Sequence, residues 1–202
     1  MSSWRDRLNQ LGSKTRFVVC RIFLHLAGDD VAMLLGVLND AGRKAVAAEG
    51  EMDVLGEGLV EICQSLLQYD ADWIAAANEG DVFWDEGDAG DYVTELFTES
   101  AQRYRSAPEP APSSNAAAEE PLSLPATHHL VVMLTVAVEG EVPELETDLS
   151  SISALKAGLN ALINLHYQGR LRAIQVHFSP AKLGDELSAD QVLANFPELI
   201  PL

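Results

Sequence analysis

The segment from Leu130 to Val138 constrains the fold more than any other part of the chain. It reads LVVMLTVAV, and Thr135 is its one polar residue. Its side chains alternate between two apolar faces, and such a strand is stable in water only where both faces are covered. We therefore expect a strand that is buried mostly on both sides.

Two further segments alternate as strands. Residues 16–27 carry Arg21 and His25 on one face, and the opposite face is wholly apolar and should meet the core. This apolar face consists of Val18, Cys20, Ile22, Leu24 and Leu26. Residues 171–178 form the third expected strand, with Ile174, Val176 and Phe178 directed inward.

Helical spacing dominates the remaining segments. Apolar residues recur every three or four positions over 31–41, 55–67, 92–104 and 155–166. We expect a shorter helix, capped by Asp70 or Asp72, to run through the alanines at 75–77, followed by a loop over 79–91. The pattern S-x-x-Q over 188–191 matches a capping box at the start of a terminal helix.

The prolines indicate the domain organisation. Residues 107–127 hold five of the nine prolines, so we expect a semi-extended Pro/Ala-rich linker there. It separates an N-terminal strand plus helical part over 16–106 from a C-terminal β-α-β-α part over 128–202. Since neither part has enough strands alone, the two should share one core. The expected fold is α+β: a small three-stranded, mainly antiparallel sheet covered by five or six helices.

The chain is strongly and unevenly acidic. It has 13 Lys and Arg against 31 Asp and Glu, which gives a formal net charge of −18. Residues 45–102 contain 15 acidic residues and no basic one, whereas the first 21 residues contain five basic residues. This charge excludes nucleic acid as a partner, because neutralising phosphates requires a surplus of Lys and Arg. Apolar residues make up 48% of the chain, enough for a folded core.

We interpret the acidic block as an anionic helical face that binds a protein partner with a basic surface. The partner-surface residues are Glu57, Glu61, Asp81, Asp85, Glu86, Asp88, Asp91, Glu95 and Glu99. Two alternatives are a solvated face that only keeps the protein soluble, and an adaptation to high salt. Homo-oligomerisation is a further alternative, because a three-stranded sheet leaves edges that must be paired or covered.

A second functional hypothesis concerns the polar face of the sheet. Arg21, His25, Gln175 and His177 should share this face with Thr135, and an Arg–His pair there could bind a small ligand or a metal. The simpler interpretation is a solvent-facing sheet surface. The phosphate-binding, HExxH and GxSxG motifs are all missing, so we expect a non-enzymatic protein with no cofactor, no catalytic residue and no metal site.

The ends of the chain and the cysteines bear on localisation. No apolar run follows the basic N-terminus, so we expect a soluble, cytoplasmic protein without a signal peptide. Residues 4–16 could form a basic amphipathic helix at a membrane surface, although the acidic body would oppose binding to an anionic bilayer. Cys20 and Cys63 lack a CxxC partner and should be buried thiols.

Three stretches resemble a family known from cyanobacteria, plastids and other bacteria, the domain of unknown function 1517. The stretches are RFVVCRIFLHLAG over 16–28, GLVEICQSLLQYDADWIAAANEG over 58–80 and LRAIQVHFSPAKLGDELSADQVLANFPELIPL over 171–202. The matching residues are those of helix caps and packing, with no catalytic signature among them. The resemblance therefore implies a fold and no particular activity. Commoner members often carry an N-terminal targeting segment, a membrane-spanning stretch and a Gly-rich region, and we expect none of these in this protein.

Overall fold

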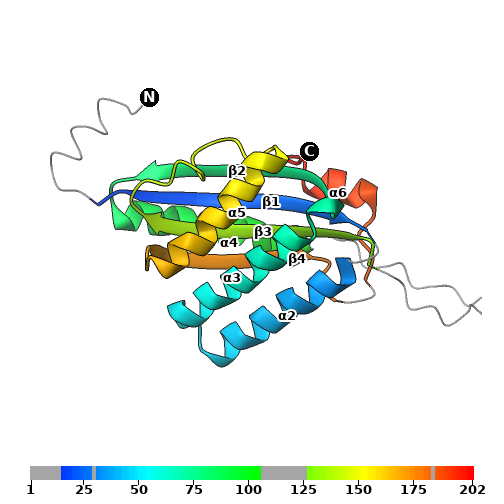
Figure 1. Ribbon diagram of the computed structural model, residues 1–202, viewed down its shortest axis with the longest axis horizontal. Coiled ribbons are helices and arrows are strands. Elements are labelled where there is room, and N and C mark those ends of the chain that lie inside the picture. The colour runs from blue at the N-terminus through cyan, green and yellow to red at the C-terminus, as the bar shows by residue number, and fades with distance from the viewer. Residues whose placement is uncertain (1–14, 29–30, 106–126, 183–184) are drawn as a thin grey trace, which may run out of the picture.

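The computed structural model describes residues 15–28, 31–105, 127–182 and 185–202, and its centre is one antiparallel sheet. The strands are β1 (Phe17–Ala27), β2 (Trp73–Phe83), β3 (His129–Glu139), β4 (Leu171–Ser179) and β5 (Ile200–Pro201). Their order across the sheet is β4-β3-β1-β2-β5. The first strand of the chain therefore lies in the middle of the sheet (Figure 1).

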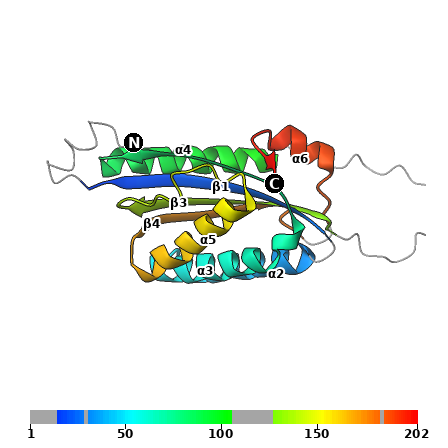
Figure 2. The same cartoon turned by 45° about the horizontal axis from the view of Figure 1, so that its top comes forward.

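Helices cover both faces of the sheet. They are α2 (Val31–Ala47), α3 (Met52–Gln68), α4 (Glu86–Arg105), α5 (Ile152–Tyr167) and α6 (Ala189–Asn195), with a 3-10 turn η1 at Asp70–Asp72. Figure 2 shows α2, α3 and α5 on one side and α4 and α6 on the other. The sheet is thus the middle of three layers, which explains why β3 can be apolar on both faces.

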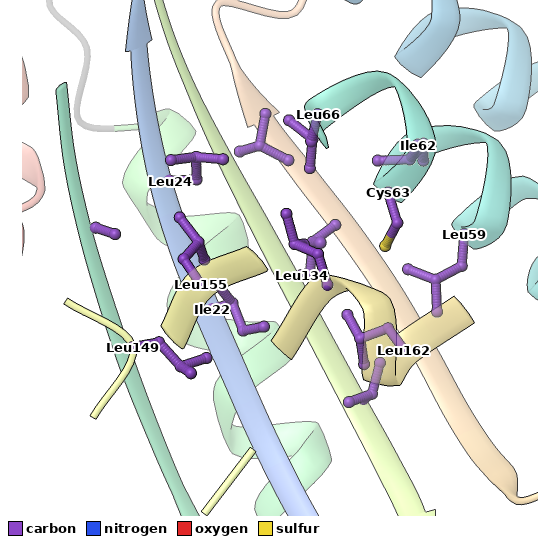
Figure 3. Packing of buried hydrophobic residues seen from close by; sticks show 14 of the residues in the cluster. Ile22, Leu24, Leu59, Ile62, Cys63, Leu66, Leu134, Leu149, Leu155 and Leu162 are labelled. Carbon is purple, nitrogen blue, oxygen red and sulfur yellow. The ribbon is translucent and has the colours of Figure 1, made fainter. Parts of the chain in front are cut away.

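The main core lies between the sheet and the α2, α3 and α5 layer. It contains four of the five residues of the apolar face predicted for β1, including Ile22 and Leu24, and the even-numbered residues of β3 such as Leu134. Cys63 and Leu162 contribute from α3 and α5 (Figure 3). The opposite face of β1 supplies Phe17, Val19 and Phe23 to two smaller clusters beneath α4 and α6.

The prediction of a three-stranded sheet is wrong, because the sheet has five strands. Residues 73–83 form β2 instead of a short helix and a loop. Alanines at 75–77 have high helix propensity, but pairing with the central strand β1 overrides it. The two-residue strand β5 pairs with Ala75 and Ala76, and it is too short to show an alternating pattern. The α+β class and the antiparallel pairing agree with the prediction.

Strand pairing joins the N-terminal and C-terminal parts of the chain. β1 pairs with β3 along its whole length, from Phe17 opposite Glu139 to Ala27 opposite His129. The predicted linker lies outside the described residues except for Thr127, whose hydroxyl donates to the carbonyl oxygen of Asp185. The N-terminal residues predicted to contact a membrane also lie outside them, apart from those at 15–16.

The predicted capping box of α6 is confirmed by side-chain hydrogen bonds, and α5 also begins at a capped residue. Ser188 and Gln191 form the capping box of α6, since the Ser188 side chain accepts from the Gln191 N–H and the Gln191 side chain accepts from the Ser188 N–H. Ser151 caps α5 by accepting from the backbone N–H of Ala154. These caps fix where each helix begins after an irregular segment.

Candidate functional site

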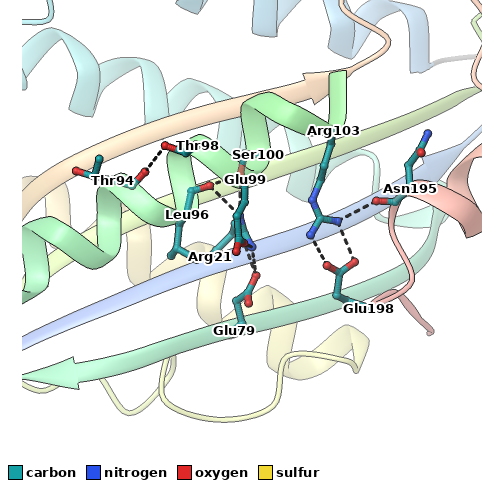
Figure 4. Close-up of polar contacts among 10 residues, drawn as sticks. All are labelled: Arg21, Glu79, Thr94, Leu96, Thr98, Glu99, Ser100, Arg103, Asn195 and Glu198. Atoms are coloured by element: carbon teal, nitrogen blue, oxygen red, sulfur yellow. Dashed lines mark hydrogen bonds and ion pairs between the residues drawn. The ribbon is translucent and has the colours of Figure 1, made fainter. Parts of the chain in front are cut away.

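Arg21 is the centre of a polar contact between the sheet and α4. It is only 1% exposed. Its guanidinium donates to the Leu96 carbonyl oxygen at 2.8 Å and to Ser100 Oγ at 2.9 Å, and it forms ion pairs with Glu79 and Glu99 (Figure 4). Together with the bond from Nε to Glu79, all five N–H groups of Arg21 are used within the protein. No donor remains for a bound anion.

A row of directly opposed residues extends from Arg21 across the sheet. Arg21 lies opposite Thr135, and Thr135 lies opposite Gln175. Thr135 Oγ1 and Gln175 Oε1 are buried and have no hydrogen-bond partner among the described residues. A buried polar atom without a partner lowers stability, so the apolar packing of α4 around this row must offset the cost.

The two histidines of this face have different surroundings. His25 Nε2 lies 3.0 Å from His129 Nδ1. Burial, followed by the positive charge of His129, lowers the pKa of His25 from 6.5 to about 4. The His177 ring packs 5.2 Å from that of Phe97, and burial, followed by the charge of Arg21, lowers the pKa of His177. These surroundings favour the neutral form of both imidazoles.

The structure does not gather the four predicted ligand-binding residues around one opening. A hollow of about 530 Å³ adjoins Arg21 and is lined also by Glu79, Glu99, Gln102, Arg103, Ala194, Asn195 and Glu198. Its lining does not include His25, Gln175 or His177. Helices α4 and α6 cover this sheet face, so it is not the solvent-facing surface that the simpler interpretation expected.

Arg103 connects α4 to the C-terminal segment. Its guanidinium forms an ion pair with Glu198 and donates to the Asn195 carbonyl oxygen at 2.9 Å (Figure 4). It also lies over the rings of Phe23 and Phe196, at 5.2 and 5.6 Å from their centres. The positive charges of Arg21 and Arg103 are therefore held in internal contacts.

The predicted acidic face is divided between two layers of the molecule. Glu57 and Glu61 lie on α3, and Glu61 forms an ion pair with Lys44 of α2. The other seven predicted residues lie on the opposite side of the sheet, on β2, on α4 or at 85 between them. They are Asp81, Asp85, Glu86, Asp88, Asp91, Glu95 and Glu99. The structure thus brings these seven together and leaves the α3 pair apart.

The long helix α4 has a buried side and an exposed acidic side. Its buried stripe consists of Ala89, Val93, Leu96 and Ser100. Tyr92 of α4 contacts Phe83 of β2. Glu99 of α4 forms an ion pair with Arg21, which is also paired with Glu79 of β2. The flank of α4 that carries Tyr92 and Glu99 therefore faces β2. By helical spacing, Asp88, Asp91 and Glu95 share that flank, and all three are exposed. We call Asp81, Asp88, Asp91 and Glu95 the acidic surface.

Asn78 and Glu79 were not predicted to have a role. The Asn78 amide donates to the Thr147 carbonyl oxygen at 3.0 Å and accepts from the Leu149 N–H at 2.8 Å, which fastens the segment before α5 to β2. Both residues belong to a segment interpreted as the end of a helix and a loop. The β-forming Val82 and Phe83 after Gly80 were the signal that could have indicated a strand.

Among the described residues, no group of three or more His, Cys, Asp or Glu side chains has an arrangement that could hold a metal ion. In the same part of the chain, every helix is too short or too polar to cross a bilayer.

Fold and surface together define a three-layer α+β protein that holds Arg21 and Arg103 in internal contacts and exposes carboxylates along one sheet edge. The chain belongs to the DUF1517 family, described as a protein of unknown function, whose model matches residues 16–202. This match confirms the resemblance inferred from the three sequence stretches. Comparisons with curated proteins and with solved structures gave no match.

Proposed function

We propose that this protein is a non-enzymatic binding protein that docks a partner with a basic surface at its acidic surface. The proposal rests on the distribution of charge on this side of the sheet. Asp81, Asp88, Asp91 and Glu95 are exposed on one side of the sheet, while Arg21 and Arg103 on that side are held in ion pairs. The carboxylates are thus left to attract a partner's cations.

Two properties of the chain support a cytoplasmic location and a protein partner. Cys20 and Cys63 are free, buried thiols, as is usual in a reducing compartment. Burial raises the pKa of the Cys20 thiol to about 12, which makes it unreactive. A surface of clustered carboxylates repels nucleic-acid phosphates and anionic lipid, so a basic protein is the partner that fits it.

The test compares two triple variants with the same change in net charge. Asp88→Asn, Asp91→Asn and Glu95→Gln neutralise three of the four carboxylates of the acidic surface. Glu49→Gln, Glu51→Gln and Glu57→Gln neutralise three exposed residues of the α2–α3 hairpin on the other side of the sheet.

Affinity-tagged protein is used to capture partners at low and at high salt, and the bound proteins are identified and quantified. We expect the first triple variant and high salt each to release the same partners, while the second triple variant retains them. Partners that stay bound to the first variant, or that bind equally at both salt concentrations, would contradict the proposal.

A further inference from the structure

Most of β2 lies at an open edge of the sheet. On its inner side it pairs with β1 from Phe83 to Trp73. On its outer side, β5 pairs only with Ala75 and Ala76. From residue 77 to residue 83, this outer edge therefore has no strand partner among the described residues. An unpaired edge of this kind is a template for the addition of another strand.

Hydrogen bonds within the sheet establish which β2 groups point outward. The Gly140 N–H donates to the Arg16 carbonyl oxygen, and the Gly28 N–H donates to the His128 carbonyl oxygen. The backbone N–H and C=O groups of even-numbered residues of β1 therefore point toward β3. The backbone groups of odd-numbered residues of β1 then point toward β2. These residues lie opposite the odd-numbered residues of β2, whose backbone groups point back toward β1.

The backbone N–H and C=O groups of Asn78, Gly80 and Val82 consequently point outward from the open edge of β2. The Val82 N–H donates to Asp81 Oδ1 at 2.7 Å instead of to a strand. Farther along the same edge, the Ile74 carbonyl oxygen accepts from the Leu202 N–H, which agrees with this alternation. The open edge thus offers strand-type acceptors at Asn78, Gly80 and Val82, and strand-type donors at Asn78 and Gly80.

A hollow of about 440 Å³ adjoins this edge on the side of α5. It is lined by Val18, Val19, Asn78, Glu79, Gly80, Asp81, Val82 and the segment 145–148. Gly80 contributes no side chain to it, and a Cβ at this position would lie 2.2 Å from the Val19 carbonyl oxygen. The side chains of an added strand that point toward α5 would enter this hollow beside Gly80 and the exposed residues at 147–148.

The charges around the edge select the kind of strand. Glu79 and Glu146 already form ion pairs with Arg21 and Arg16, whereas Asp81 is exposed and its carboxylate lies at the open edge. Asp81 points to the same side as α4, whose acidic flank lies beyond it. A second copy of this chain would bring the same carboxylates to the edge and be repelled.

We infer that the outer edge of β2 from Asn78 to Val82 binds an extended basic segment of a partner protein by strand addition. Alternate basic side chains face Asp81 and the acidic flank of α4, and the intervening small or apolar side chains enter the hollow. This inference rests on the proposed function, since it states how the basic partner is held. The bound segment thus has a basic residue at every second position.

The experiment uses the full chain and two probes of equal charge. The first is a six-residue peptide of alternating lysine and valine with blocked ends, and the second is the same peptide N-methylated at every residue. N-methylation keeps the charges but removes the backbone donors. Because two or more backbone hydrogen bonds are lost, we expect binding to weaken about tenfold or more, as measured by calorimetry.

Amide hydrogen exchange supplies a second measurement with a specific pattern. The unmodified peptide should slow exchange at Asn78 and Gly80 and leave Glu79 and Asp81 unchanged, since the latter two already face β1. Asp81→Asn should weaken binding by about twofold to fivefold. Asp53→Asn, which changes an exposed residue of α3, should have no effect.

The outcomes separate the two proposals. Equal binding of both peptides, or protection without the alternation, would overturn strand addition while leaving charge-based docking in place. Absence of binding by the unmodified peptide would also overturn strand addition. In either case, comparing the α4 triple variant with the α2–α3 triple variant decides the proposed function independently.

Discussion

His25 should make the stability of this protein depend on pH in the mildly acidic range. The residue is 6% exposed, and its pKa falls from 6.5 to about 4 in the folded protein. In the unfolded chain His25 takes up a proton as the pH falls through 6.5, but the folded protein resists this until about pH 4. Its contribution to stability is therefore complete above pH 6.5 and is lost as the pH falls toward 4.

The magnitude follows from these two pKa values. Each pH unit between them corresponds to about 1.4 kcal/mol. Between about pH 7 and pH 5, the free energy of unfolding should fall by about 2 kcal/mol because of His25 alone. Urea unfolding at both pH values measures this change, and it corresponds to a midpoint shift of about 1 M for a chain of ordinary urea sensitivity.

The variant His25→Gln isolates the contribution of His25 and of its contact with His129, because titrating groups away from this pair affect both proteins equally. We expect the wild type to lose about 2 kcal/mol more than His25→Gln over this pH interval. His128→Gln controls for the removal of one exposed histidine. Equal losses in the wild type and His25→Gln would refute the reasoning, as would a His25 resonance that titrates near its ordinary pKa of 6.5 by NMR.

Three substitutions should change stability in ways that unfolding in urea can measure. Gly80→Ala should destabilise by about 2 to 4 kcal/mol, because its Cβ would lie 2.2 Å from a backbone oxygen of β1, whereas Gly90→Ala, which meets nothing within 4 Å, is the control. Asn78→Ala should cost about 1 to 3 kcal/mol, since two backbone groups at 147 and 149 lose their partner; a loss within experimental error would contradict this. Ser188→Ala should cost about 1 kcal/mol by removing the capping box, and an unchanged midpoint would show that α6 does not need it.

The strands with a clear period of two could be predicted from the sequence, and β2 could not. In β1, β3 and β4, apolar residues alternate and indicate both the strand and its inward face. In β2, alanines and Gly80 give no such pattern, because its stability as a strand comes from pairing with β1. That information resides in the partner strand, which local propensity does not record.

The candidate site was predictable in its residue types and not in its arrangement. The acidic character of residues 45–102 was evident, but the sequence does not indicate that α3 and α4 cover opposite faces of the sheet. That division depends on the path of the chain through β2. Likewise, the polar nature of Arg21 was evident, but its partner Glu79 lies in a segment that was not expected to form a strand.

The central position of β1 has a consequence for synthesis on the ribosome. When the first half of the chain has left the ribosome, β1 can pair with β2, but its other edge stays unpaired. Its second neighbour, β3, is made only after more than half of the chain. We therefore expect nascent chains that stop before β3 to be held by chaperones or degraded. The sheet should be completed only late in synthesis, when β3 pairs with β1.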